Sequence, residues 1–167
     1  MADYYSHTVV QPDIPKAAFT ALEFKLMCEM FEHEMSGEDV YFFSSMGPSN
    51  LVFIGIDEAK ALIAEDAGIA SRITEQVETA LAELDDAEIE IELDFSDLEY
   101  ETILQDVVRR SALDFVEIMS AWTCSKMRPD GFGGAASLIS ADRIAVMSTG
   151  QFLEEEIGRL ELRHGPE

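Results

Sequence analysis

The chain has 167 residues, enough for one domain with its own core, and hydrophobic residues make up 47% of it. Its formal net charge at pH 7 is −23, because 34 acidic residues stand against 11 basic ones. A charge of that size repels DNA, RNA and anionic membranes, and it favours encounter with basic surfaces. The composition therefore predicts a folded protein with a basic partner, and it speaks against direct binding of nucleic acid.

Cysteine usage and hydropathy indicate the compartment. The two cysteines, Cys28 and Cys124, lack CxxC spacing, and residues 1–16 contain neither a basic n-region nor an apolar h-region. The longest apolar runs, such as residues 51–56, are far shorter than a bilayer-spanning helix. We therefore expect a cytoplasmic protein that does not enter membranes.

The start of the chain predicts an arm outside the domain. Residues 1–16 contain Pro12 and Pro15, which favour an extended segment. The domain is then expected over residues 17–163, with a short tail at 164–167. No internal repeat divides this range, so a single domain is predicted.

A helix is expected directly after the arm. Thr20 and Glu23 have the spacing of a capping box, in which each side chain bonds the backbone of the other residue. Gly37 is typical of a helix stop, so the predicted helix covers residues 21–36. Its broad apolar face includes Met30 and Phe31.

The next segments predict a hairpin and two helices. Residues 39–45 and 51–55 are rich in β-branched and aromatic side chains, and turn residues separate them. Acidic residues then open a helix over residues 57–66, where the helix dipole favours them. Helical spacing of apolar residues continues over residues 69–84.

Residues 88–95 alternate strictly between acidic and apolar side chains, which is typical of a half-buried strand. The side chains expected in the core are Ile89, Ile91, Leu93 and Phe95. The side chains expected outside are Glu88, Glu90, Glu92 and Asp94. Ser96 and Glu99 have capping-box spacing and predict a helix that ends at Arg109 and Arg110.

The last third of the chain predicts a central strand, shorter strands and a final helix. Residues 114–124 are apolar on both faces, and residues 135–140 and 143–147 supply further strands. The final helix is expected to direct Phe152, Leu153, Ile157 and Leu160 inward. Together these elements predict an α+β fold, with a mainly antiparallel or mixed sheet of about five strands and four to five helices.

The negative charge is concentrated in the middle of the chain. Residues 73–108 contain 13 acidic residues and no Lys or Arg. Alternate carboxylates on a strand lie about 6.8 Å apart, and a duplex presents one phosphate per about 3.4 Å of its axis on each strand. The predicted partner-binding residues are Glu83, Asp85, Asp86, Glu88, Glu90, Glu92, Asp94, Asp97, Glu99, Glu101 and Asp106. A merely solvated acidic surface is the alternative.

A second candidate site is the loop 124–134, which combines glycines with cations in an otherwise acidic chain. It matches neither GxxxxGK[ST] nor GxGxxG, and Pro129, Asp130 and Gly131 are typical of a turn between strands. The residues of this possible secondary site are Trp122, Lys126, Arg128, Asp130 and Phe132. An enzyme using Cys124, Lys126, Arg128 and Asp130 is a further alternative, since nearby cations lower a thiol pKa.

No metal site or cofactor is predicted. Glu29, Glu32, His33 and Glu34 crowd one stretch, but their spacing does not give the Glu-x-x-His pairs of a di-iron protein. A solvated helix face explains these residues better. The calcium-loop pattern is also missing from the sequence.

Two segments, DYYSHTVVQPDIP at 3–15 and TCSKMRPDGFGG at 123–134, resemble an uncharacterised family of small proteins carried on bacterial plasmids and other mobile elements. The resemblance implies a setting in which anti-restriction and anti-CRISPR proteins are common, many of them acidic mimics of DNA. It assigns no site residue.

Three functions from different classes follow from these observations. The first is a non-enzymatic DNA mimic that blocks the basic nucleic-acid-binding surface of a host defence or DNA-processing protein. The second is a structural or regulatory module, possibly a homo-oligomer, that makes contact through the first helix or the loop 124–134. The third is the small enzyme described above.

Overall fold

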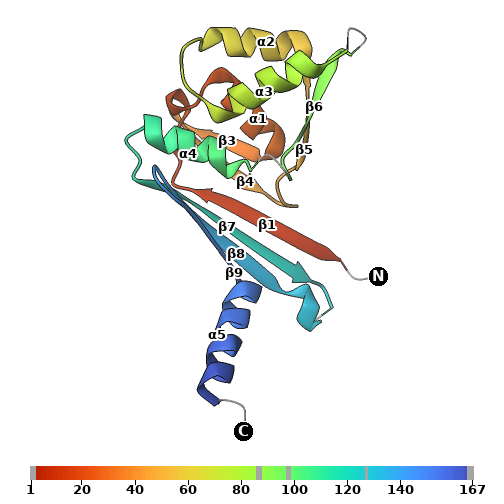
Figure 1. The fold of residues 1–167 in the computed structure, drawn as a ribbon, viewed down its shortest axis with the longest axis vertical. Coiled ribbons are helices and arrows are strands. Elements are labelled where there is room, and N and C mark those ends of the chain that lie inside the picture. The colour runs from red at the N-terminus through yellow and green to blue at the C-terminus, as the bar shows by residue number, and fades with distance from the viewer. Residues whose placement is uncertain (1–2, 86–87, 97–98, 127, 165–167) are drawn as a thin grey trace.

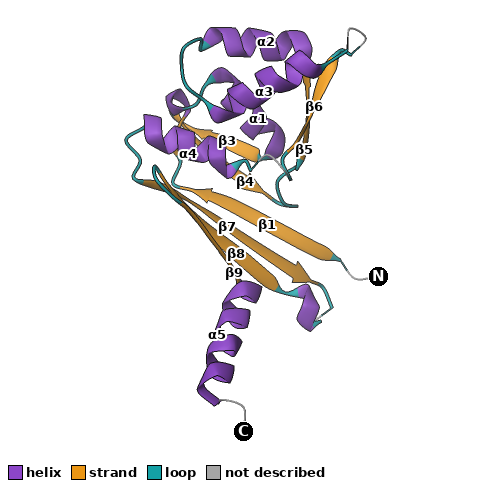
Figure 2. Cartoon of the chain, in the orientation of Figure 1, coloured by secondary structure: helices purple, strands orange, loops and turns teal. Residues whose placement is uncertain are grey.

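The computed structural model describes residues 3–85, 88–96, 99–126 and 128–164, and Figures 1 and 2 show its arrangement. The α-helices are α1 (Ala21–Met30), α2 (Ile56–Glu65), α3 (Arg72–Glu83), α4 (Glu101–Arg110) and α5 (Thr149–His164). The strands are β1 (Tyr4–Gln11), β2 (Ile14–Pro15), β3 (Glu32–Ser36), β4 (Asp39–Ser44), β5 (Leu51–Gly55), β6 (Glu90–Asp94), β7 (Phe115–Cys124), β8 (Gly133–Ser140) and β9 (Ile144–Ser148). The predicted α+β single domain is confirmed.

Two antiparallel sheets organise the domain. The larger sheet has seven strands, in the order β2-β4-β1-β7-β8-β9, with β3 paired to β4 as well. The smaller sheet consists of β5 and β6. In the larger sheet Val10 lies opposite Ile118, and Val116 lies opposite Ile139. These four residues are buried, so the register places the apolar set on one face of the sheet.

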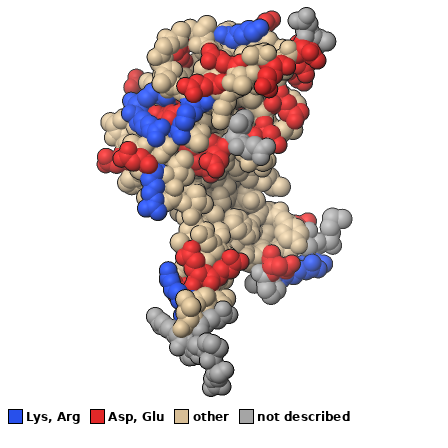
Figure 3. Space-filling view, viewed as in Figure 1, with Lys and Arg blue, Asp and Glu red and all other residues tan. Residues whose placement is uncertain are grey.

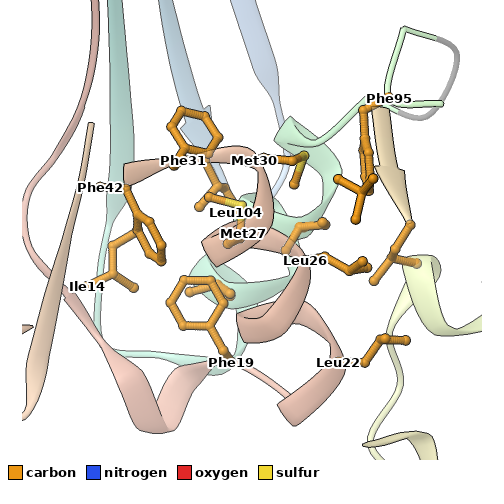
Figure 4. Packing of buried hydrophobic residues seen from close by; sticks show 14 of the residues in the cluster. Ile14, Phe19, Leu22, Leu26, Met27, Met30, Phe31, Phe42, Phe95 and Leu104 are labelled. Atoms are coloured by element: carbon orange, nitrogen blue, oxygen red, sulfur yellow. The ribbon is translucent and has the colours of Figure 1, made fainter. Parts of the chain in front are cut away.

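Helices α1 to α4 lie on that face of the larger sheet, and they enclose the core with the β5–β6 sheet (Figure 1). Figure 4 shows the rings of Phe19 and Phe31, which flank α1 on either side, close to Phe42 of β4. The rings of Phe19 and Phe31 pack edge to face against the ring of Phe42. Their centroids lie 5.8 Å and 6.2 Å, respectively, from the Phe42 centroid. Burial of each such side chain contributes roughly 1.5–3 kcal/mol to folding.

The predicted arm of residues 1–16 is wrong for most of its length. Residues 4–11 form β1, an interior strand that pairs with β4 on one side and β7 on the other. Thr8 and Val10 alternate into the core, whereas Val9 faces the other way. Pro12 and Pro15 lie after β1, so they remove no hydrogen bond from it. Residues 4–11 can therefore form a strand.

The first helix begins where predicted and ends six residues early. Thr20 and Glu23 form the expected capping box. Residues 32–36 are not helical but form β3, which pairs with β4 across a tight turn. Gly37 has a φ of 67° and therefore supplies the turn conformation, not a helix stop.

The contact predicted through the first helix cannot use the side chains of Met30 and Phe31. Met30 and Phe31 are each 3% exposed and belong to the core. A surface built on these two side chains is therefore inaccessible in the folded chain.

The predicted hairpin of residues 39–45 and 51–55 does not form, although both strands exist. Strand β4 belongs to the larger sheet, and β5 pairs instead with β6. Pairing with β6 buries Val52 and Ile54 beside Ile91, which an isolated hairpin would not do. The intervening segment crosses from one sheet to the other.

The two later helices differ from prediction in their surroundings. Helix α4 begins at Glu101 with Tyr100 at its N-cap, and no side chain caps it, so the Ser96–Glu99 capping box is wrong. Helix α5 exists, but Phe152, Leu153, Ile157 and Leu160 are 51–57% exposed and do not face the core. Within the described ranges, none of the helices combines the length and apolar character needed to cross a membrane.

Candidate partner-binding surface

The small β5–β6 sheet has one buried and one exposed face. Its register pairs Phe53 with Glu92 and Leu51 with Asp94. Alternation buries Ile91 and Leu93, so the intervening acidic side chains must point outward. The exposed face thus has a row of carboxylates on one strand and apolar side chains on the other.

We call the exposed carboxylates at this end of the molecule the acidic face; they are Glu83, Asp85, Glu88, Glu90, Glu92 and Asp94. Figure 3 shows acidic side chains gathered over α2, α3 and β6. Among the ion pairs of the described residues, none involves a member of the acidic face. The face therefore presents charge that the rest of the described chain does not neutralise.

A groove of about 600 Å³ runs between α3 and β6. Its apolar lining includes Phe53, which is 49% exposed, and Ile89, which is 83% exposed. Its acidic lining is Glu83, Glu88, Glu90 and Glu92. Such a surface fits a Lys or Arg side chain, because the aliphatic stem contacts the apolar floor while the cation meets a carboxylate.

Sequence reasoning missed the apolar part of this surface. Ile89 was expected in the core because it alternates with Ile91 and Leu93. The strand begins one residue later, at Glu90, and the Ile89 side chain is 83% exposed although its carbonyl accepts a hydrogen bond from the Ile56 N–H at 3.1 Å. No sequence pattern singles out Phe53, whose pairing with Glu92 of β6 brings it beside the carboxylates.

Two members of the acidic face are held in place by hydrogen bonds. The Ser96 backbone N–H donates to Asp94 Oδ1 at 2.8 Å. Hydrogen bonding to the Ser96 side chain and backbone holds the pKa of the Asp94 carboxyl below its ordinary value. Glu88 Oε2 accepts a 3.0 Å hydrogen bond from the Asp85 backbone N–H. These contacts fix the carboxylates at both ends of β6.

Asp106 does not belong to this surface, although it was predicted there. It is 6% exposed, and its carboxylate pairs with Arg72 at 2.9 Å and Arg109 at 3.1 Å. Arg72 and Arg109 lie just outside the segment 73–108, which has no Lys or Arg. They neutralise Asp106, the last acidic residue of that segment. Asp106 therefore joins α4 to the start of α3 and cannot meet a partner.

The remaining predicted residues are placed differently. Glu101 is partly buried at the start of α4, and burial raises the pKa of its carboxyl. Glu99 is exposed just before that helix. Asp86 and Asp97 lie outside the described residues.

The predicted secondary loop site lies between β7 and β8 of the larger sheet and not on the β5–β6 sheet (Figure 1). Trp122 and Phe132 are 37% and 44% exposed, and Lys126, Arg128 and Asp130 are exposed as well. Cys124 is buried, at 4% exposure. The structure therefore keeps this loop apart from the acidic face.

His33 lies on β3 and not on the predicted first helix. His33 Nε2 lies 3.7 Å from Cys28 Sγ. Burial raises the pKa of the Cys28 thiol, which disfavours the reactive thiolate. Among the described residues, no group of three or more His, Cys, Asp and Glu side chains is arranged to hold a metal ion.

Comparison of the chain with models of protein families, with curated proteins and with solved structures finds no match.

Proposed function

We propose that the protein is a non-enzymatic binding protein of the bacterial cytoplasm. Its acidic face occupies the basic nucleic-acid-binding surface of a host defence or DNA-processing protein. The protein acts as a mimic of DNA toward that partner and denies it access to nucleic acid. The likeness of residues 3–15 and 123–134 to plasmid-carried proteins supports the same setting.

The observation that carries this proposal is the row of Glu90, Glu92 and Asp94 on the exposed side of β6. Their side chains lie about 6.8 Å apart along the strand, a distance that equals the rise along the duplex axis over two phosphates of one DNA strand. A rigid strand holds them in place, so little side-chain order is lost on binding. The exposed Phe53 and Ile89 add apolar contact for the stems of Lys and Arg.

Charge reversal on β6 tests the proposal. We expect immobilised wild-type protein to recover a nucleic-acid-binding protein from a bacterial lysate. The variant Glu90→Lys/Glu92→Lys should lose it, because each reversal turns an attraction into a repulsion. The recovered protein, once purified, should also lose binding to a labelled DNA duplex when wild-type protein is added.

The matched control is Glu34→Lys/Glu38→Lys, which changes the net charge equally at exposed residues in and beside β3. This control should recover the same protein as wild type. Equal recovery by both double variants would show that net charge, and not the acidic face, attracts the partner. A partner that binds its duplex equally well with and without wild-type protein would rule out mimicry.

A further inference from the structure

The larger sheet has a second face on which apolar side chains are exposed. The register places Met119, Ala136 and Met147 in one row across β7, β8 and β9. Leu138 and Phe115 have the same orientation, since alternate residues of a strand share a face. The core side chains Ile118 and Ile139 point the other way. We call the surface formed by Phe115, Met119, Ala136, Leu138, Ala145 and Met147 the outer face.

The outer face is hollowed by a groove of about 550 Å³. Small side chains form its floor, because Ala136 stands between Met119 and Met147 in their row, and Ala145 stands beside Leu138. The larger side chains form its walls. A trough of this kind accepts the ridge of a helix.

Helix α5 has an apolar stripe that lacks a partner in the described chain. At 100° per residue, Phe152, Leu153, Ile157 and Leu160 fall on one side of the helix, where Glu156, paired with Arg159, also lies. Leu162 falls on the opposite side. The helix contacts β8 and β9, from which it emerges, and then points away from the body on the side opposite to α1–α4 (Figure 1). Its stripe therefore does not cover the outer face of its own chain.

We propose that the occupant of the outer face is α5 of a second copy of this chain. In a two-fold pair each copy gives its α5 to the outer face of the other, so both apolar surfaces are covered at once. One chain already contains the ridge and the trough that such a contact requires. This dimer uses neither the acidic face nor the buried residues Met30 and Phe31, and it goes beyond the binding function proposed above.

The exposed apolar area suffices for a stable dimer. Eight side chains take part, each 43–57% exposed: Phe115, Met119, Leu138, Met147, Phe152, Leu153, Ile157 and Leu160. A side chain of this size that is half exposed leaves roughly 100 Å² open, so the eight offer about 800 Å² per copy, the usual contribution of one partner.

The charge distribution favours this surface over any other for self-association. Two copies of a chain with a net charge of −23 repel each other. The repulsion is weakest where residues 109–167 meet, because that segment has nine acidic and seven basic residues. The groove itself is lined by one acid, Glu117, and one base, Arg143. The least charged third of the chain thus carries the exposed apolar surface.

Charge introduced into the stripe should separate the copies. We expect wild-type protein at about 100 μM to have twice the 18.6 kDa mass of the chain by light scattering after gel filtration. Ile157→Glu/Leu160→Glu should raise the dimer Kd about 100-fold or more, since carboxylates would be buried in an apolar contact. Leu162→Glu is the control, because this leucine lies on the other side of α5 and is 87% exposed.

Cross-linking distinguishes exchange of α5 from its folding back within one chain. In a background of Cys28→Ser and Cys124→Ala, one protein carries Ile157→Cys and a second carries Leu138→Cys. Mixing them should give a covalent dimer under mild oxidation. A mixture of Leu162→Cys with Leu138→Cys should give at least tenfold less.

Three results would overturn the proposal. One is a wild-type protein that remains monomeric at the concentration given above. Another is a dimer that the double glutamate variant leaves intact while circular dichroism shows it folded. The third is a cross-link that forms when both cysteines share a chain and never between separate chains.

Discussion

Arg110, the last residue of α4, forms an ion pair with Glu23 in the first turn of α1, and the Glu23 side chain is fully buried. The same carboxylate accepts hydrogen bonds from the Thr20 backbone N–H at 2.9 Å and from Ser71 Oγ at 2.7 Å. Arg110 also donates to the Ala70 carbonyl at 2.9 Å. One buried charge thus ties together the starts of α1 and α3 and the end of α4.

Loss of that arginine should be costly. Arg110→Ala leaves the Glu23 carboxylate buried without its counter-charge, so the free energy of unfolding should fall by about 3 kcal/mol or more. Urea denaturation at pH 7 measures it. The control is Lys25→Ala, which removes surface pairs with Glu29 and Glu58 and should cost less than about 1 kcal/mol. Equal costs for the two variants would contradict the role assigned to Glu23.

The ion pairs of Asp106 should make stability depend on pH. Burial alone would raise the pKa of this carboxyl, but hydrogen bonds from Arg72 and the charges of Arg72 and Arg109 outweigh burial and lower it. Because the pKa is lower in the folded state, ionised Asp106 stabilises the fold above its unfolded pKa of about 3.9. That contribution is lost as the pH falls through the folded pKa.

Comparison with Asp106→Asn isolates this effect. The variant should be less stable than wild type at pH 7 by about 2 kcal/mol, the cost of a broken buried charge-assisted bond. The difference in unfolding free energy should shrink as the pH is lowered from 7 through the unfolded pKa of about 3.9 and then through the lower folded pKa, where the wild-type carboxyl also takes up its proton. A difference that stays constant between these pH values would refute the assignment.

The only tryptophan of the chain reports on the packing at the end of β7. A Cβ built on Gly133 would lie 2.1 Å from Nε1 of Trp122, so Gly133→Ala should displace the indole and shift its fluorescence. We expect only a small loss of stability, about 0.5 kcal/mol, because the indole is 37% exposed and can move aside. Gly158→Ala is the matched control: its Cβ meets nothing within 4 Å, and in helix α5 it should add about 0.5–1 kcal/mol. An unshifted Gly133→Ala spectrum would contradict this placement of the indole.

Salt should act in opposite directions on the two proposed contacts. Binding of the basic partner to the acidic face rests on attraction, so its Kd should rise about tenfold or more between about 50 and 500 mM NaCl. The dimer instead forms against the repulsion of like-charged copies, so screening should lower its Kd. Sedimentation for the dimer and calorimetry for the partner give the two constants. A dimer that weakens with salt would indicate charge pairing instead of apolar contact.

Much of the local structure was predictable because its signals lie close together in the sequence. Thr20 and Glu23 fixed the start of α1 through a contact three residues apart. The alternation around Ile91 and Leu93 identified β6 and its exposed carboxylates. Such contacts involve short separations, and the residue types alone specify them.

Other features depend on partners far along the chain. Strand β1 is stabilised by β7, more than a hundred residues later, and β3 by its pairing with β4. The lack of Lys and Arg in residues 73–108 suggested that Asp106 is exposed, yet Arg72 and Arg109 reach it from just beyond that segment. The apolar stripe of α5 has the spacing of a core-facing helix, and nothing in its spacing tells whether its own chain or another copy covers it.

Strand β9 gives the acidic excess a further consequence. Among the described strands it pairs with β8 alone, and its residues 144–148 include neither charge nor proline. An edge of that kind is a template for aggregation. The net charge of −23 keeps such edges apart at neutral pH, and near the isoelectric point of about 4.2 that protection vanishes. Colloidal stability is thus a second use of this charge, beside the proposed binding of a partner.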